Sequence, residues 1–148
     1  MLTIDAVRRS GVGLRPEQTI REAAVLMGSA GVGSLAVVEN EELLGIVTDR
    51  DLVRRGLARD LSSNARVDGV MSSPVVTISA DADLHDAFAL FRTHAVRRLA
   101  VVRGKRFVGM ITIDDLLVDL AADMADIARP VTAELLFGHH DSAVPARS

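Results

Sequence analysis

The sequence predicts an α/β protein built from two copies of one β-α-β-β-α unit. Residues 12–53 align without a gap with residues 76–117 when the sequence is shifted by 64 positions, and 12 of the 42 aligned pairs are identical. Within each copy, the apolar residues switch between strand spacing and helix spacing in the same order. We therefore expect the two copies to share one fold and to pack through their sheets as a pseudo-twofold pair.

Each copy should open with a short strand and a capped helix. The apolar runs at residues 12–14 and 75–78 predict the strands. Thr19 and Glu22 have the spacing of a capping box, and Asp83 replaces Thr19 in the second copy. Because apolar residues then recur at helix spacing, a helix should follow each cap.

A hairpin and a second helix complete each copy. Two apolar runs on either side of a polar turn predict an antiparallel hairpin in each copy. The runs cover residues 35–38 and 43–47 in the first copy and 99–102 and 107–111 in the second. A second helix should start after Thr48 and after Thr112. Pro130 should end the last helix, which is longer than its counterpart.

The predicted organisation has four parts. They are residues 3–60 for the first repeat, 61–73 for a connector with a brief helical turn near residues 67–70, 74–129 for the second repeat with its extended last helix, and 130–148 for a C-terminal tail. The end of the tail is small and polar, so we expect it to be partly disordered.

Composition excludes several classes of function. The 148 residues include no cysteine, which rules out disulfides, thiolate zinc sites and cysteine nucleophiles. A net charge of −3 and only 3% aromatic residues argue against a nucleic-acid surface. No window approaches the roughly 18 apolar residues of a membrane span, and the N-terminus lacks the features of a secretory signal. The prediction is a cytoplasmic protein without membrane or nucleic-acid partners.

Three motifs carry a family resemblance. Residues 45–52 read GIVTDRDL and residues 109–116 read GMITIDDL, so both fit the pattern G-h-h-T-x-x-D-h, where h is apolar. Residues 70–77, VMSSPVVT, are similar to the usual entry into a repeat of the same family. Over about residues 3–120 the chain resembles tandem CBS (cystathionine-β-synthase) domains, the regulatory pair also called a Bateman module.

The resemblance implies a non-enzymatic sensor with no required cofactor, whose ligand is AMP, ADP or ATP, with NAD and S-adenosylmethionine as further candidates. The residues that it assigns to the ribose hydroxyls are Thr48 with Asp51 and Thr112 with Asp115. A carboxylate can accept hydrogen bonds from a vicinal diol. The same Thr-x-x-Asp spacing is also an ordinary helix capping box, so that interpretation stays open.

Three arginines are candidates for the phosphates. In the family, basic residues just before the first hairpin strand contact phosphate, which implies Arg97 and Arg98, and antiparallel pairing should bring them close to Thr112. Arg50 would favour phosphate at the first site, whereas Asp114 would disfavour it at the second. We therefore expect the Asp51 site to be the tighter one.

The resemblance also implies that adenine is held near the first strand of each repeat. The residues of this adenine region are Val12, Gly13, Val75 and Thr77. A ligand between the repeats would shift their relative orientation, and a separate effector protein, not identified by the sequence, would respond. A homodimer formed through the helices, as a flat disc, is expected by the same resemblance.

Other functions have less support. A ligand-independent dimeric scaffold of the same fold is the main alternative, with the Thr and Asp pairs acting only as caps. A small hydrolase that uses the Asp pairs at the helix starts has no support in the sequence beyond those carboxylates. His139 and His140 lack a third ligand for a metal, and no catalytic residues are predicted.

Overall fold

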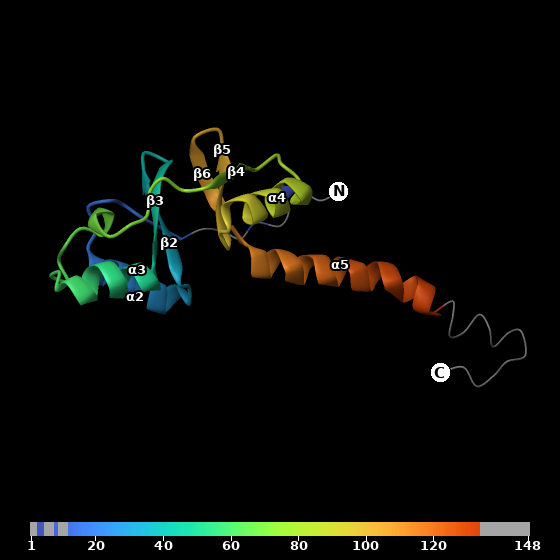
Figure 1. Ribbon diagram of the computed structural model, residues 1–148, viewed down its shortest axis with the longest axis horizontal. Helices are drawn as coiled ribbons and strands as arrows, with labels where there is room; N and C mark the ends of the chain where they lie inside the picture. Colours follow the sequence, from blue (N-terminus) through green and yellow to red (C-terminus); the bar gives the residue numbers. More distant parts are fainter. Residues whose placement is uncertain (1–2, 5–7, 9–11, 134–148) are drawn as a thin grey trace, which may run out of the picture. The chain divides into compact units, whose positions relative to one another are not determined.

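The structure, a computed structural model, describes residues 3–4, 8 and 12–133. The chain divides into two units, residues 1–112 and 113–148. The elements of the first unit are β1 (Gly13–Leu14), α2 (Ile20–Ala30), β2 (Ser34–Glu39), β3 (Glu42–Thr48), α3 (Asp49–Asp51), η1 (Leu52–Gly56), η2 (Leu57–Arg59), η3 (Val67–Gly69), β4 (Thr77–Ser79), α4 (Leu84–His94), β5 (Arg98–Arg103) and β6 (Arg106–Thr112) (Figure 1). The second unit contains α5 (Ile113–Ala133). This element order confirms the repeated β-α-β-β-α pattern.

The six strands form one sheet whose order is symmetric about its centre, β1-β2-β3-β6-β5-β4. β1 is parallel to β2, β4 is parallel to β5, and each following hairpin is antiparallel. β3 and β6 pair at Glu42 and Arg106, beside a hydrogen bond of 2.9 Å from the Phe107 amide to the Glu41 carbonyl. The two repeats thus meet edge to edge, which confirms the pseudo-twofold arrangement.

Both predicted capping boxes are present. The Glu22 amide donates to Thr19 Oγ1 at 3.1 Å, and the Thr19 amide donates to Glu22 Oε1 at 3.3 Å. At the start of α4, the Asp86 amide donates to Asp83 Oδ1 at 2.9 Å, and the Asp83 amide donates to Asp86 Oδ2 at 3.3 Å. These reciprocal bonds satisfy backbone donors that the first helical turn leaves free.

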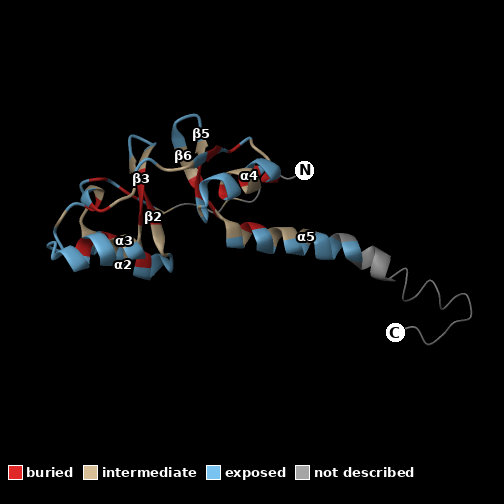
Figure 2. Ribbon diagram, viewed as in Figure 1, coloured by how far each residue is buried: buried red, intermediate tan, exposed pale blue. Residues whose placement is uncertain are grey.

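The core of the first repeat lies between α2 and the strands. Its buried side chains are Leu14, Ala23, Met27, Leu35, Val37, Val47, Val67 and Val70. Val67 and Val70 come from the predicted connector, in and just after the short helical turn η3, and both are fully buried. The connector is therefore part of this core, and the buried positions follow the strands and the inner face of α2 (Figure 2).

Two helices differ from the prediction. After Thr48 the chain makes three α-helical residues, then the π-helical turn η1, in which the Leu57 amide points at the carbonyls of both Leu52 and Val53. The prediction that Pro130 ends the last helix is wrong, because α5 continues to Ala133. Proline has a helical φ; it removes one hydrogen bond and bends a helix without obliging it to stop.

Residues 134–148, most of the predicted tail, lie outside the described residues. Within the part of the chain that the structure describes, no helix combines the length and the apolar character needed to cross a bilayer.

The two repeats end their first helix with the same left-handed residue but with different side chains. Gly31 closes α2 with φ 66°, and Ala95, 64 positions later, closes α4 with φ 52°. Because Cβ disfavours this conformation, Ala95→Gly is expected to raise the free energy of unfolding by about 0.5–1 kcal/mol. Urea denaturation checks this, with Gly31→Ala as the reciprocal variant, which should be destabilised. A loss of stability in Ala95→Gly would contradict the argument.

Candidate functional site

The first Thr-x-x-Asp motif forms a compact helix start at the end of β3. The Asp51 amide donates to Thr48 Oγ1 at 3.1 Å, and the Thr48 amide donates to Asp51 Oδ2 at 3.0 Å. The Asp51 side chain is only 14% exposed. The capping interpretation therefore holds for this pair. The cap uses Oδ2 of the carboxylate, and the other oxygen, Oδ1, lies 3.9 Å from Arg55 Nε.

Arg55 and the connector lie next to this helix start. Arg55 Nε is 3.9 Å from Asp51 Oδ1, and Arg55 Nη1 donates to the Met71 carbonyl at 3.1 Å. The following residue, Ser72, pairs with Ile46 of β3 through two backbone hydrogen bonds of 2.8 and 3.1 Å. Arg55 is not among the predicted site residues. Its i, i+4 spacing from Asp51 was a usable signal, whereas its bond to Met71 was not.

Gly45, the first residue of the motif, allows the connector to approach β3. A Cβ added at this position would lie 2.7 Å from Met71 Sδ and 2.8 Å from the Ser72 carbonyl oxygen. Both distances are too short for any side chain. The glycine of the motif therefore has a packing role, which is to let residues 71–72 pair with β3.

The candidate phosphate residues lie at strand and helix starts. Arg98 begins β5 and is directly opposite Thr112 in the antiparallel register, as predicted. Arg97 precedes it, and both arginines and Arg50 are exposed. In the first repeat, Ser34 takes the place of Arg98, opposite Thr48. The basic pair is thus built into the second repeat only.

The charges around the two helix starts are more alike than the sequence analysis assumed. Asp49 and Asp51 both lie in the first turn of α3, and Asp114 and Asp115 both lie in the first turn of α5. The charge difference in these turns is therefore Arg50, which only the first has. The Arg50 amide also donates to Asp49 Oδ1 at 2.7 Å.

The second Thr-x-x-Asp pair is divided between the two units. Thr112 ends β6 in the first unit, and Asp115 lies in α5 of the second. Their role as a joint site therefore stays a prediction.

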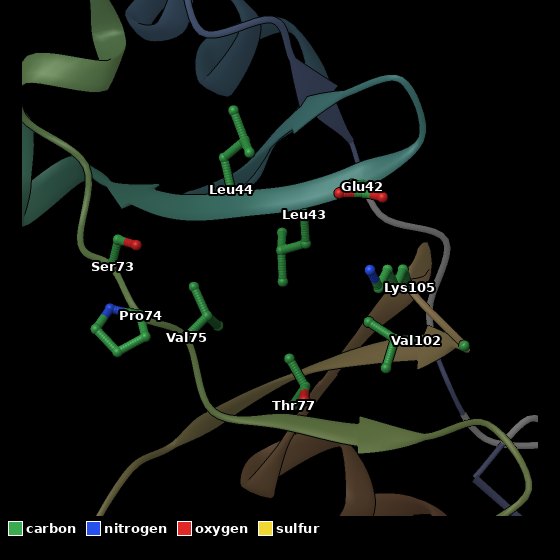
Figure 3. A pocket seen from close by; sticks show the side chains of 10 residues that line it. Glu42, Leu43, Leu44, Ser73, Pro74, Val75, Thr77, Val102 and Lys105 are labelled. Carbon is green, nitrogen blue, oxygen red and sulfur yellow. The ribbon is translucent and has the colours of Figure 1, made fainter.

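A pocket of about 320 Å³ lies between the two repeats, within the first unit (Figure 3). Its lining residues are Glu42, Leu43, Leu44, Ser73, Pro74, Val75, Thr77, Val102, Gly104 and Lys105. Adjacent side chains of a strand point to opposite faces of the sheet. Leu43 points into the pocket towards Val75, and Leu44 points away to the core of the first repeat (Figure 3).

The pocket brings together two of the four residues of the predicted adenine region, Val75 and Thr77. Val12 and Gly13 lie elsewhere, beside Ala36 at the β1 edge of the sheet. Thr48 is also distant from the lining residue Glu42, because the two mark opposite ends of β3, about 20 Å apart at 3.3 Å per residue. The predicted site residues are thus spread over the sheet, from its outer β1 edge to the pocket between the repeats.

Metal ligands do not gather in the described part of the chain, where no three His, Asp or Glu side chains are close enough to hold an ion. The His139 and His140 pair lies outside the described residues.

Comparisons with known proteins agree with the repeat and its geometry. A family model described as CBS domain matches residues 5–58 and 67–122. The CBS domain-containing protein YhcV of Bacillus subtilis is 39% identical over 104 residues, covering 70% of this chain and 74% of YhcV. Hypoxic response protein 1 of Mycobacterium tuberculosis is 30% identical over 119 residues, covering 78% of this chain and 83% of that protein.

A solved structure shows the same fold with a ligand. The CBS domain protein PAE2072 of Pyrobaculum aerophilum, complexed with AMP, superimposes with a TM-score of 0.70 and 26% sequence identity. The match covers 82% of this chain and 99% of PAE2072.

Proposed function

This chain belongs to the CBS-domain family, and we propose that it is a regulatory module that binds an adenosine-containing nucleotide between its two repeats. A change in their relative arrangement would then be transmitted to a separate effector protein. We propose no catalytic activity for it. We propose the cytoplasm as its location, as the sequence predicts.

The observation that carries this proposal is the environment of the Asp51 carboxylate. Its carboxylate is nearly buried, held by the Thr48 amide, and placed beside the connector that joins the repeats. A carboxylate oxygen accepts more than one hydrogen bond, so Oδ1 can receive ribose hydroxyls while Oδ2 keeps the cap. The AMP complex of PAE2072 supports this ligand class.

The remaining residues take the roles that the sequence predicts. Thr112 and Asp115 would form the second, weaker ribose site, and Arg97, Arg98 and Arg50 would contact phosphate. Val75 and Thr77 would contact the base from the side of the pocket, and Val12 and Gly13 would do so from β1. Which of AMP, ADP, ATP, NAD or S-adenosylmethionine fits best depends on how much space the group attached to the ribose 5′ carbon requires.

Dimerisation is also proposed. Val25 of α2, Val53 of η1 and Leu57 of η2 are 65%, 56% and 75% exposed, although all three are apolar. Burying such side chains against a second copy would remove apolar surface from water. The same surface favours the alternative function, a ligand-independent scaffold, in which the capping box is the only role of Thr48 and Asp51.

Isothermal titration of the purified chain with AMP, ADP, ATP, NAD and S-adenosylmethionine tests the proposal, with the oligomeric state measured by light scattering. At least one of these ligands should bind saturably, with heat that fits one tight and one weak site per chain. A folded dimer that gives no heat with any of them would exclude the sensor and favour the scaffold.

A further inference from the structure

A single guanidinium group joins the Asp51 helix start to the connector. Arg55 lies four residues after Asp51, in the π-helical turn η1, and its side chain is 43% exposed. Its Nε faces Asp51 Oδ1 at 3.9 Å while its Nη1 donates to the Met71 carbonyl at 3.1 Å. π-helical turns inside helices are frequent at functional sites. Arg55 therefore contacts both the Asp51 carboxylate, which we propose binds the ligand, and the segment that enters the second repeat.

Downstream of this contact the connector pairs with β3 before it enters β4. The Ser72 amide donates to the Ile46 carbonyl at 2.8 Å, and the Ile46 amide donates to the Ser72 carbonyl at 3.1 Å. Residues 73–75 then line the inter-repeat pocket, and Thr77 starts β4 beside Ala100. A shift at Met71 can thus reach both the pocket and the sheet of the second repeat.

Arginine is suited to this double contact. Its rigid planar fork carries five donors, so one nitrogen can face a carboxylate while another bonds a carbonyl. An exposed ion pair of this length contributes little to stability by itself. The position of Arg55 is therefore better explained by the geometry that it imposes than by the strength of its pair with Asp51.

We propose that Arg55 is a positioning residue that couples occupancy of the Thr48–Asp51 site to the position of the connector. This inference rests on the proposed function. A ligand hydroxyl that donates to Asp51 Oδ1 would lie next to Arg55 Nε, which is 3.9 Å from that oxygen, and would push the guanidinium aside. Because the guanidinium is rigid, displacing Nε also moves Nη1 and alters its bond to Met71. The ligand thereby favours a different placement of residues 71–77.

Amide hydrogen exchange measured by NMR tests the coupling, with the Ser72 and Ile46 amides as reporters and AMP as the ligand. Saturating AMP should change the exchange rates of both amides by about fivefold in the unmodified chain. Arg55→Lys keeps the positive charge beside Asp51 but cannot reach both acceptors. It should bind AMP within about threefold of the unmodified affinity and lose the exchange response. Arg54→Lys, the exposed neighbour, should behave like the unmodified chain.

The outcomes separate this inference from the proposed function. If Arg55→Lys binds AMP and its reporter amides still respond as in the unmodified chain, Arg55 is not the coupling residue and the sensor proposal is unaffected. If the unmodified chain binds none of the nucleotides in the titration, the proposed function fails and the coupling fails with it. Loss of the response in both Arg55→Lys and Arg54→Lys would also overturn the specific role of Arg55.

Discussion

Replacing Asp51 with alanine is expected to lower the affinity of the chain for its nucleotide by about 10- to 100-fold, the range for losing hydrogen bonds to a charged group. The reason is that Asp51 Oδ1 is the acceptor that we assign to the ribose hydroxyls. Isothermal titration with the nucleotide that binds best measures the change. Asp115→Ala should have a smaller effect, because the site on the second repeat is predicted to be the weaker one.

A matched control separates ligand binding from helix capping. Asp86 has the same place in the capping box of α4, where its Oδ2 accepts the Asp83 amide at 3.3 Å. Asp86→Ala and Asp51→Ala should each lower the free energy of unfolding by a similar amount, about 0.5–1 kcal/mol. Only Asp51→Ala should lose affinity. Equal affinities for the two variants would mean that Asp51 is a cap and nothing more, as in the scaffold alternative.

Gly45→Ala is expected to lower the free energy of unfolding by about 1–3 kcal/mol, the usual effect of overpacking. Its new Cβ would lie 2.8 Å from the Ser72 carbonyl oxygen, which is backbone and cannot rotate away. Relief requires the connector to separate from β3, which breaks the two Ile46–Ser72 hydrogen bonds. Denaturation in urea, followed by circular dichroism, measures the loss.

Gly28→Ala is the control for this substitution. Gly28 lies in α2, and a Cβ added there meets no atom within 4 Å. The same change of side chain should therefore stabilise the chain by about 0.5–1 kcal/mol, since alanine favours the helix. If Gly45→Ala were as stable as Gly28→Ala, the close approach of the connector to β3 would not exist in solution.

The architecture of the repeats could be predicted because its signals are local. The change of apolar spacing and the capping residues at Thr19 and Asp83 depend on neighbours in the chain, and the 64-residue repeat shows that both halves carry the same local signals. The ends of the helices were harder to predict from the sequence. The π-helical turn after Asp51 and the continuation of α5 past Pro130 depend on packing and on the small differences in energy between helical forms.

The candidate site was predictable to the same extent. Thr48 and Asp51 are three residues apart, so their meeting at a helix start follows from the motif, and the pairing of Arg98 with Thr112 follows from the hairpin. The spacing of Arg55 from Asp51 was visible in the sequence, but its bond to Met71, 16 residues away, was not, because no local pattern specifies the path of the chain between them.

By itself, the sequence determined the repeated α/β fold, the family and one pair of candidate ligand residues, because all three are recorded in short-range patterns. Tertiary structure alone decided that the connector packs on Gly45, that Val75 and Thr77 share a pocket with Leu43, and that Val12 and Gly13 lie apart from it. These contacts join segments that are distant in the chain. Their geometry is set by the packing of the whole unit, which spacing along the sequence does not encode.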